Sequence, residues 1–217
     1  MNIDPRRLEA ATDGNLADRV YAHIMKELAE GRMKSGGAIQ ESRIADMLGL
    51  SRTPVRDALG RLEGEGLLIR EGRLLSVRRM TIKEFLDLLY VRRLIEPEAA
   101  WLACGSVNPR LLRDLRDRLG SDPGDAAGPD WDLDEAIHLA IVDALDNHAL
   151  AELVRSLRRR TLLFEFSELP GEEISGHAVL VRFVQALIDK DRNGAKLAMT
   201  DHLEDLREKI VSHVRSL

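Results

Sequence analysis

Residues 41–68, with the sequence ESRIADMLGLSRTPVRDALGRLEGEGLL, decide the fold of the first part of this chain. The stretch predicts a short helix over 41–48 and a second helix that begins after Ser51, a good N-cap residue. Gly49 stands just past the first helix, where a left-handed backbone is needed and glycine adopts it readily. Pro54 falls in the first turn of the second helix, where its missing N–H costs little. Two helices joined by a tight turn are therefore expected.

The segments on either side complete a small domain. Apolar residues at a spacing of four predict a helix over 16–30. Its expected apolar face consists of Leu16, Val20, Ile24 and Leu28. After the second helix, apolar runs at 67–70 and 74–77 flank a short loop that contains glycine, which is typical of a β-hairpin. Three helices followed by a hairpin indicate a winged helix-turn-helix, which we expect over 16–78 after a flexible tail over 1–15.

Polar side chains in this domain are placed to read DNA. In helix-turn-helix proteins the N-terminal end of the second helix points into the major groove, where arginine binds guanine or phosphate and hydroxyl groups bind phosphate. A glycine at the hairpin tip lets the turn approach DNA closely. The alternative is that the two arginines only decorate a solvated helix face. The residues that we expect to contact DNA are Ser51, Arg52, Thr53, Arg56, Gly72 and Arg73.

The charge distribution permits this interpretation without proving it. The whole chain carries a formal charge of −5, but residues 1–79 hold 14 basic and 12 acidic side chains, whereas the remainder is acidic. Only the N-terminal part is therefore expected to meet phosphate. The single cysteine, Cys104, excludes an intrachain disulfide framework and a cysteine-built zinc site. No stretch approaches the roughly 18 apolar residues of a membrane helix and the chain does not start like a signal peptide, so we expect a cytoplasmic protein.

From Thr81 onward every predicted element is helical, so the fold class is mainly α. The low aromatic content, 4%, also favours a helical core built from aliphatic residues. Thr81 and Glu84 match the capping-box pattern at the start of a helix. We expect residues 79–217 to form an all-α antiparallel bundle. Its helices are predicted at 81–103, 109–119, 131–145, 148–168, 172–189 and 191–215.

One aspartate and three histidines of the bundle form a candidate metal-binding set. Asp134 and His138 are four residues apart and so share a helix face, while His177 begins a later helix and His202 lies in the last one. A bundle can bring the inward faces of three helices to one point. These ligand types suit a divalent transition metal: Zn²⁺ first, with Ni, Mn or Fe as alternatives. The alternative for the Asp134–His138 pair is an ordinary hydrogen bond.

Both halves of the chain resemble one family of bacterial regulators. Residues 41–59, followed by Leu62, 65–68, Gly72 and Val77, are similar to the signature of GntR-family transcription regulators. The resemblance implies DNA contacts by Arg52, Thr53, Arg56 and the wing glycine. Residues 92–97 with Ala99 and Ala100, 134–138, Asn147 with Leu150, His177 and 199–203 resemble the FCD domain of the FadR subfamily. That resemblance implies that the bundle over 79–217 serves effector binding and dimerisation, with Asp134, His138, His177 and His202 as metal ligands.

These expectations combine into one hypothesis. A symmetric dimer would bind a short palindromic operator and act as a repressor or an activator. A small carboxylate effector would take open metal positions, and Arg92 would bind its carboxylate unless Arg92 forms a structural ion pair with Glu96. Two rivals remain: a metal-dependent enzyme, against which no positioned general base is found beyond the ligands, and a purely structural metal without effector control.

Overall fold

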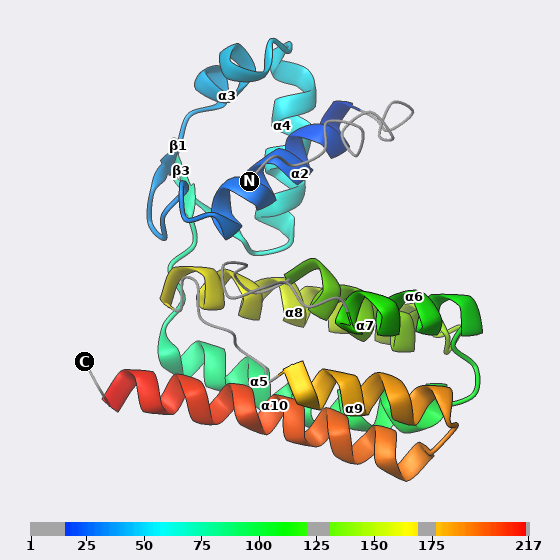
Figure 1. Cartoon of the computed structure of the whole chain (residues 1–217). Helices are drawn as coiled ribbons and strands as arrows, with labels where there is room; N and C mark the ends of the chain where they lie inside the picture. Colours follow the sequence, from blue (N-terminus) through cyan, green and yellow to red (C-terminus); the bar gives the residue numbers. More distant parts are fainter. Residues whose placement is uncertain (1–15, 121–130, 169–176, 216–217) are drawn as a thin grey trace. The chain divides into compact units, whose positions relative to one another are not determined.

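The computed structural model describes residues 16–120, 131–168 and 177–215 (Figure 1). The chain divides into two compact units between Met80 and Thr81. Among the described residues, the first unit contains three helices and a small sheet, and the second unit is entirely helical. The mainly helical fold class predicted from the sequence is confirmed. No described helix has the length and apolar character needed to cross a membrane.

The N-terminal unit is a winged helix-turn-helix. Its helices are α2 (Leu16–Ala29), α3 (Glu41–Leu48) and α4 (Arg52–Gly64), and its strands are β1 (Ala38–Ile39), β2 (Leu68–Glu71) and β3 (Leu74–Val77). The strands are antiparallel in the order β1-β3-β2, with Leu68 opposite Val77. The hairpin was expected, but β1 was not, because a two-residue strand is too short to show a period of two.

The turn between α3 and α4 follows the sequence logic closely. Gly49 ends α3 with a φ of 64°, and its N–H donates to the carbonyls of Ala45 and Asp46. Ser51 takes the extended N-cap conformation before α4. Helix α4 packs against α2 through a buried apolar core. That core contains Val20, Ile24, Leu28, Val55, Ala58, Leu59 and Leu62.

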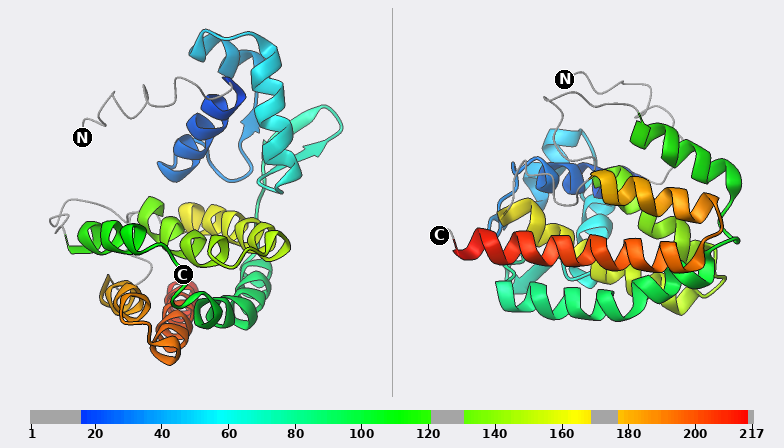
Figure 2. Two further views of the ribbon diagram at one scale, coloured as in Figure 1. Left: turned by 90° about the vertical axis from the view of Figure 1, so that its right-hand side faces the viewer. Right: turned by 60° about the horizontal axis from the view of Figure 1, so that its bottom comes forward.

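The C-terminal unit is a bundle of six described helices (Figures 1 and 2). They are α5 (Ile82–Ala103), α6 (Pro109–Gly120), α7 (Trp131–Asp143), α8 (His148–Glu168), α9 (His177–Ile188) and α10 (Arg192–Arg215). The long helix α10 lies along both α5 and α9, while α6 packs against α7 and α9. The predicted helix over 172–189 begins at His177 in the described residues, since 169–176 fall outside them.

Two features fix α5 in the bundle. At its start, the Thr81 hydroxyl accepts a hydrogen bond from the Glu84 N–H, and the Glu84 carboxylate accepts one from the Thr81 N–H, so the predicted capping box is present. Along its length, the Phe85 ring stacks on Phe164 of α8 with centroids 4.6 Å apart. These contacts place the inward face of α5 against α8 and α7, where the buried polar residues of the bundle gather.

Candidate functional site

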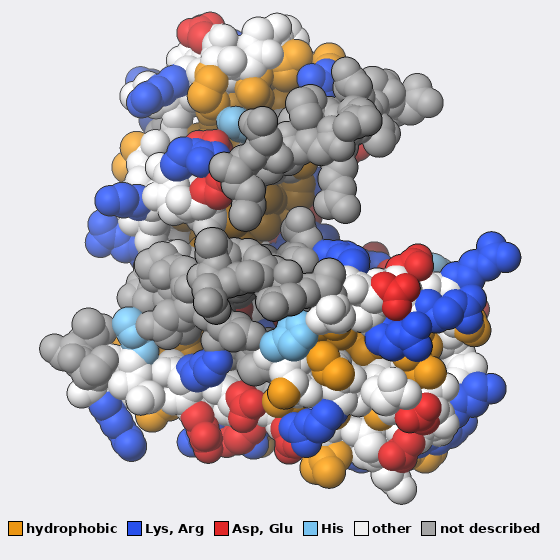
Figure 3. Space-filling model, viewed as in Figure 1, with side chains coloured by type: hydrophobic (Ala, Val, Ile, Leu, Met, Phe, Trp, Pro, Cys, Tyr) orange, Lys and Arg blue, Asp and Glu red, His pale blue; other side chains and the backbone are white. Residues whose placement is uncertain are grey.

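The predicted DNA-contacting side chains lie on the surface of the N-terminal unit. Ser51, Arg52, Thr53 and Arg56 are all exposed in the first turns of α4. Ser51 occupies the N-cap position but makes no side-chain capping bond, so its hydroxyl group is available to a phosphate. Figure 3 shows Lys and Arg side chains beside α3 and β1 on the visible face, mixed with acidic ones. This mixture of basic and acidic side chains agrees with the sequence, in which residues 1–79 hold 14 basic and 12 acidic side chains.

Arg56 forms an ion pair with an acidic neighbour. Its Nη2 lies 3.0 Å from Oε1 of Glu41 on α3, and the hydrogen bond to Glu41 raises the pKa of the Arg56 guanidinium. Both groups are accessible to solvent, so this ion pair is weak and can exchange for a phosphate or a base. At the tip of the hairpin, Gly72 has a φ of 61° and Arg73 is exposed. The turn thus has the backbone conformation for which glycine is favoured.

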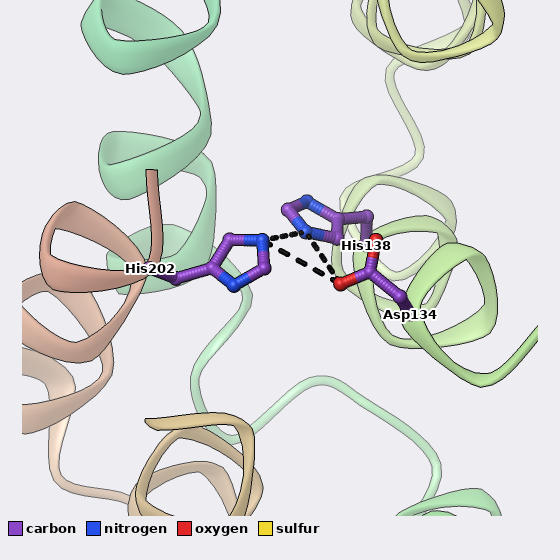
Figure 4. Close-up of side chains that lie close together, drawn as sticks. All are labelled: Asp134, His138 and His202. Carbon is purple, nitrogen blue, oxygen red and sulfur yellow. Dashed lines mark hydrogen bonds and ion pairs between the residues drawn. The ribbon is translucent and has the colours of Figure 1, made fainter. Parts of the chain in front are cut away.

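Three predicted metal ligands converge in the helical bundle (Figure 4). Asp134 and His138 project from neighbouring turns of α7, and His202 faces them from α10. One ligand atom from each residue falls within 4.8 Å of the others. Nε2 of His138 lies 2.9 Å from Nε2 of His202, and Oδ1 of Asp134 lies 3.7 Å and 3.5 Å from these two nitrogens. Three donor atoms therefore point at one place.

The donor set fits a divalent transition metal. Two imidazole nitrogens bound to one ion at about 2.1 Å lie roughly 3.0–3.4 Å apart, close to the spacing found. Oδ1 of Asp134 is buried without a hydrogen-bond partner, so this oxygen is available to an ion. Burial lowers the pKa of His138 and lowers that of His202 to about 3, which keeps both imidazoles neutral, as metal ligation requires.

A chain of buried polar residues orients His138. The Nδ1–H of His138 donates to the carboxylate of Glu96, and Glu96 accepts from Nε of Arg92 at 2.6 Å. Arg92 also donates to the Thr161 hydroxyl at 2.9 Å. Although burial opposes ionisation, the charge of Arg92 holds the pKa of Glu96 well below its usual range. Because Glu96 is a carboxylate, His138 must donate through Nδ1, which leaves the Nε2 lone pair for the metal.

The sequence analysis missed two further charged residues at this site, both on α8. Nη2 of Arg158 lies 2.6 Å from Oδ2 of Asp134, and the Arg158 side chain is buried. Glu165 is 3% exposed, and burial raises the pKa of its carboxyl group to about 7. Each has one buried atom without a hydrogen-bond partner, Nε of Arg158 and Oε1 of Glu165. Their spacing of seven places them on one helix face, but among several arginines that signal is not distinctive.

Two predicted site residues, Arg92 and His177, lie in positions that differ from those expected for binding effector and metal. Arg92 is in the buried ion pair with Glu96 that the sequence analysis gave as the alternative to effector contact. His177 is exposed at the first residue of α9 and is not in the cluster of three potential ligands found among the described residues. Neither observation tests effector binding or metal binding directly, so both roles stay predictions.

Comparison with known protein families identifies the type of domain in each unit. Residues 16–74 match the model of the bacterial regulatory proteins of the gntR family, and residues 87–205 match the FCD domain. The chain therefore belongs to the GntR family of transcriptional regulators, in the FadR-like group that carries a C-terminal FCD domain. This establishes the class of the protein: a transcriptional regulator with an N-terminal DNA-binding domain and a C-terminal helical FCD domain.

Similar proteins span nearly the whole chain. The Nta operon transcriptional regulator of Aminobacter aminovorans is 27% identical over 84% of this chain and 88% of its own length. The Exu regulon transcriptional regulator of Escherichia coli K12 is 27% identical over 92% and 86%. The solved structure of E. coli McbR/YncC superposes with a TM-score of 0.71 at 21% identity, covering 93% and 98% of the two chains. The first two of these relatives are named as transcriptional regulators.

Proposed function

We propose that this regulator binds a short palindromic operator as a homodimer, and that a small organic acid bound at a metal centre of the FCD domain changes its affinity for DNA. The observation that carries the proposal is the convergence of Asp134, His138 and His202 in the domain joined to the DNA-reading unit. A ligand can act this way only if it binds more tightly to one arrangement of the dimer than to the other.

The DNA-binding step is assigned to the exposed start of α4 and the hairpin tip. Arg52 and Arg56 would read bases or neutralise phosphates in the major groove. Ser51 and Thr53 would bind phosphate at the helix start, and Gly72 with Arg73 would contact the backbone or the minor groove.

The metal-binding step is assigned to the two imidazoles and the carboxylate, with His177 as the fourth predicted ligand. Zn²⁺ is the first candidate, and Ni, Mn and Fe are alternatives, because these ligand types do not select strongly among them. The metal would supply open positions for an organic acid. If Arg92 also binds the effector carboxylate, the effector must compete with Glu96 for the guanidinium, since Nε of Arg92 lies 2.6 Å from Glu96.

Homodimer formation is supported by an exposed apolar face on α5. Four residues within about one third of the helix circumference contribute to it. They are Tyr90, Val91, Leu94 and Leu102, and the first and third of these are more than 60% exposed. Apolar side chains gathered on one helix face are common at subunit interfaces. A two-fold dimer would present two α4 helices about one DNA turn apart.

The DNA assignment is tested by fluorescence anisotropy on a labelled fragment of the promoter region adjoining the gene. Arg52→Ala and Arg56→Ala should each cost about 1–3 kcal/mol of binding free energy. Arg113→Ala, an exposed arginine on α6, serves as the matched control and should bind like the wild type. Unchanged affinity in both α4 variants would reject the assignment.

The rival of a purely structural metal is separated by a second experiment. Organic acids that stabilise the metal-loaded protein in a thermal-shift screen are added to the same anisotropy assay. Effector control predicts that stabilising acids shift the DNA dissociation constant. A structural metal predicts that none of them does.

A further inference from the structure

We propose that Arg43, in the first turn of α3, is a further DNA contact, and that it binds a phosphate of the DNA backbone rather than a base. This inference rests on the DNA-binding step proposed above, in which the start of α4 enters the major groove. It adds a residue from a second helix to that step and specifies the kind of contact that the residue makes.

The arginines of the DNA-reading unit differ in whether they already have a partner. Some form ion pairs within the unit, and these pairs are Arg32–Glu27, Arg56–Glu41, Arg61–Glu65 and Arg70–Glu63. Arg43, Arg52 and Arg73 are exposed and form no hydrogen bond or ion pair with any residue that the structure describes. A cation without an internal partner breaks no ion pair when it binds a phosphate. Arg52 and Arg73 are already expected to contact DNA, and Arg43 is in the same state.

The contact between α3 and α4 determines where Arg43 lies. Nη2 of Arg56 is 3.0 Å from Oε1 of Glu41, so the first turn of α3 lies beside the first turns of α4. In helix-turn-helix proteins the first helix of the motif crosses the DNA backbone while the second helix occupies the major groove. Arg43 follows Glu41 by two residues and is exposed, whereas Ile44 and Ala45 are the buried residues of this helix. Its long side chain is therefore placed to reach the backbone.

The charge of α3 favours the same role. The helix carries two carboxylates, Glu41 and Asp46, and Arg43 is its single basic residue. Glu41 also loses its ion-pair partner when Arg56 binds DNA. Without Arg43, the helix that crosses the backbone would present only negative charge to the phosphates. A phosphate contact by Arg43 offsets this repulsion, and it carries no sequence information because every nucleotide offers the same group.

Anisotropy titrations at several salt concentrations test the assignment, on the labelled promoter fragment and on a fragment of unrelated sequence. Arg43→Ala should weaken binding to both fragments by a similar factor, on the order of tenfold at about 0.1 M salt for each lost contact. The slope of the logarithm of the binding constant against the logarithm of salt concentration should become shallower by about one for each bound chain. Arg43→Lys keeps the charge and should keep the slope.

Arg32→Ala is the matched control, because Arg32 is an exposed arginine of the same unit that is paired with Glu27. It should retain both the affinity and the slope. Alanine favours helix, so Arg43→Ala should fold normally, which circular dichroism checks. A wild type that binds neither fragment would reject the proposed DNA-binding step itself. If the wild type binds, an unchanged slope in Arg43→Ala would overturn the inference, and so would a loss confined to the promoter fragment, since Arg43 would then read bases.

Discussion

Nε2 of His138 and Nε2 of His202 lie 2.9 Å apart, at hydrogen-bond distance. His138 donates its Nδ1–H to the Glu96 carboxylate, so its neutral ring can only accept at Nε2. His202 must therefore donate its Nε2–H, which agrees with a buried Nδ1 of His202 that has no hydrogen-bond partner. In this arrangement one imidazole already has the tautomer that binds a metal through Nε2, and the other does not.

The first prediction concerns this tautomer. Metal binding through both Nε2 atoms should move the proton of His202 from Nε2 to Nδ1 and leave His138 unchanged. Nitrogen-15 chemical shifts of the two rings, measured with and without Zn²⁺, distinguish the tautomers. A His202 that carries its proton on Nδ1 before metal is added would contradict this assignment.

The second prediction concerns Glu96. Glu96→Gln should weaken metal binding about 10- to 100-fold, because the amide no longer fixes the tautomer and orientation of His138. Glu98→Gln is the matched control on the same helix, since Glu98 is exposed and pairs only with Lys196 among its described partners. Competition with a metal-sensitive dye measures both affinities. Equal affinities in the two variants would show that Glu96 does not position the ligand.

The third prediction concerns pH and the metal-free protein. Burial raises the pKa of Glu165 from 4.5 to about 7, so between these values the unfolded chain releases a proton that the folded chain retains. The free energy of unfolding should thus fall by up to about 3 kcal/mol as pH rises from 4.5 to 7, and it should stay at this lower value above pH 7. Glu165→Gln should be more stable than the wild type at pH 8.5, and this difference in stability should be much smaller at pH 5.

Urea denaturation followed by tryptophan fluorescence measures this difference, because both tryptophans of the chain, Trp101 and Trp131, belong to the helical unit. Glu152→Gln provides the matched control on α8, where the side chain is exposed. A Glu165→Gln stability difference that does not change with pH would contradict the assigned proton.

The fourth prediction concerns the Arg56–Glu41 ion pair. Glu41→Gln should raise operator affinity a few-fold, because Arg56 no longer has to leave a carboxylate and one negative charge near the phosphates is removed. The gain should shrink as salt rises, since exposed charges are screened. Anisotropy titrations at low and high salt give both quantities. Weaker binding of Glu41→Gln would mean that Glu41 orders Arg56 for DNA contact.

Local patterns in the sequence were sufficient for most of the fold. Gly49, Ser51 and the Thr81–Glu84 box predicted helix ends because caps depend on neighbouring residues alone. The i, i+4 spacing likewise placed Asp134 and His138 on one face. The strand β1 was missed because its two residues acquire their conformation from pairing with β3. A short stretch of sequence does not contain the distant residues against which it packs.

The same reason explains what was missed at the site. Glu96 was considered only as a partner for Arg92, and its bond to His138 spans 42 positions of the chain. Arg158 meets Asp134 across two helices, and neither it nor Glu165 stands out in a charged helix. His202, by contrast, was predicted to meet Asp134 and His138 because a bundle can bring inward helix faces to one point and because residues 199–203 resemble the FCD domain.

The metal content of protein purified without chelator tests the central claim most directly. The account predicts about one equivalent of a divalent transition metal per chain after Zn²⁺ addition and removal of free ion, by plasma mass spectrometry. It predicts a large loss of bound metal in His138→Ala and His202→Ala, with folding checked by circular dichroism. A wild-type protein that carries no metal as purified and retains none after Zn²⁺ addition would contradict it.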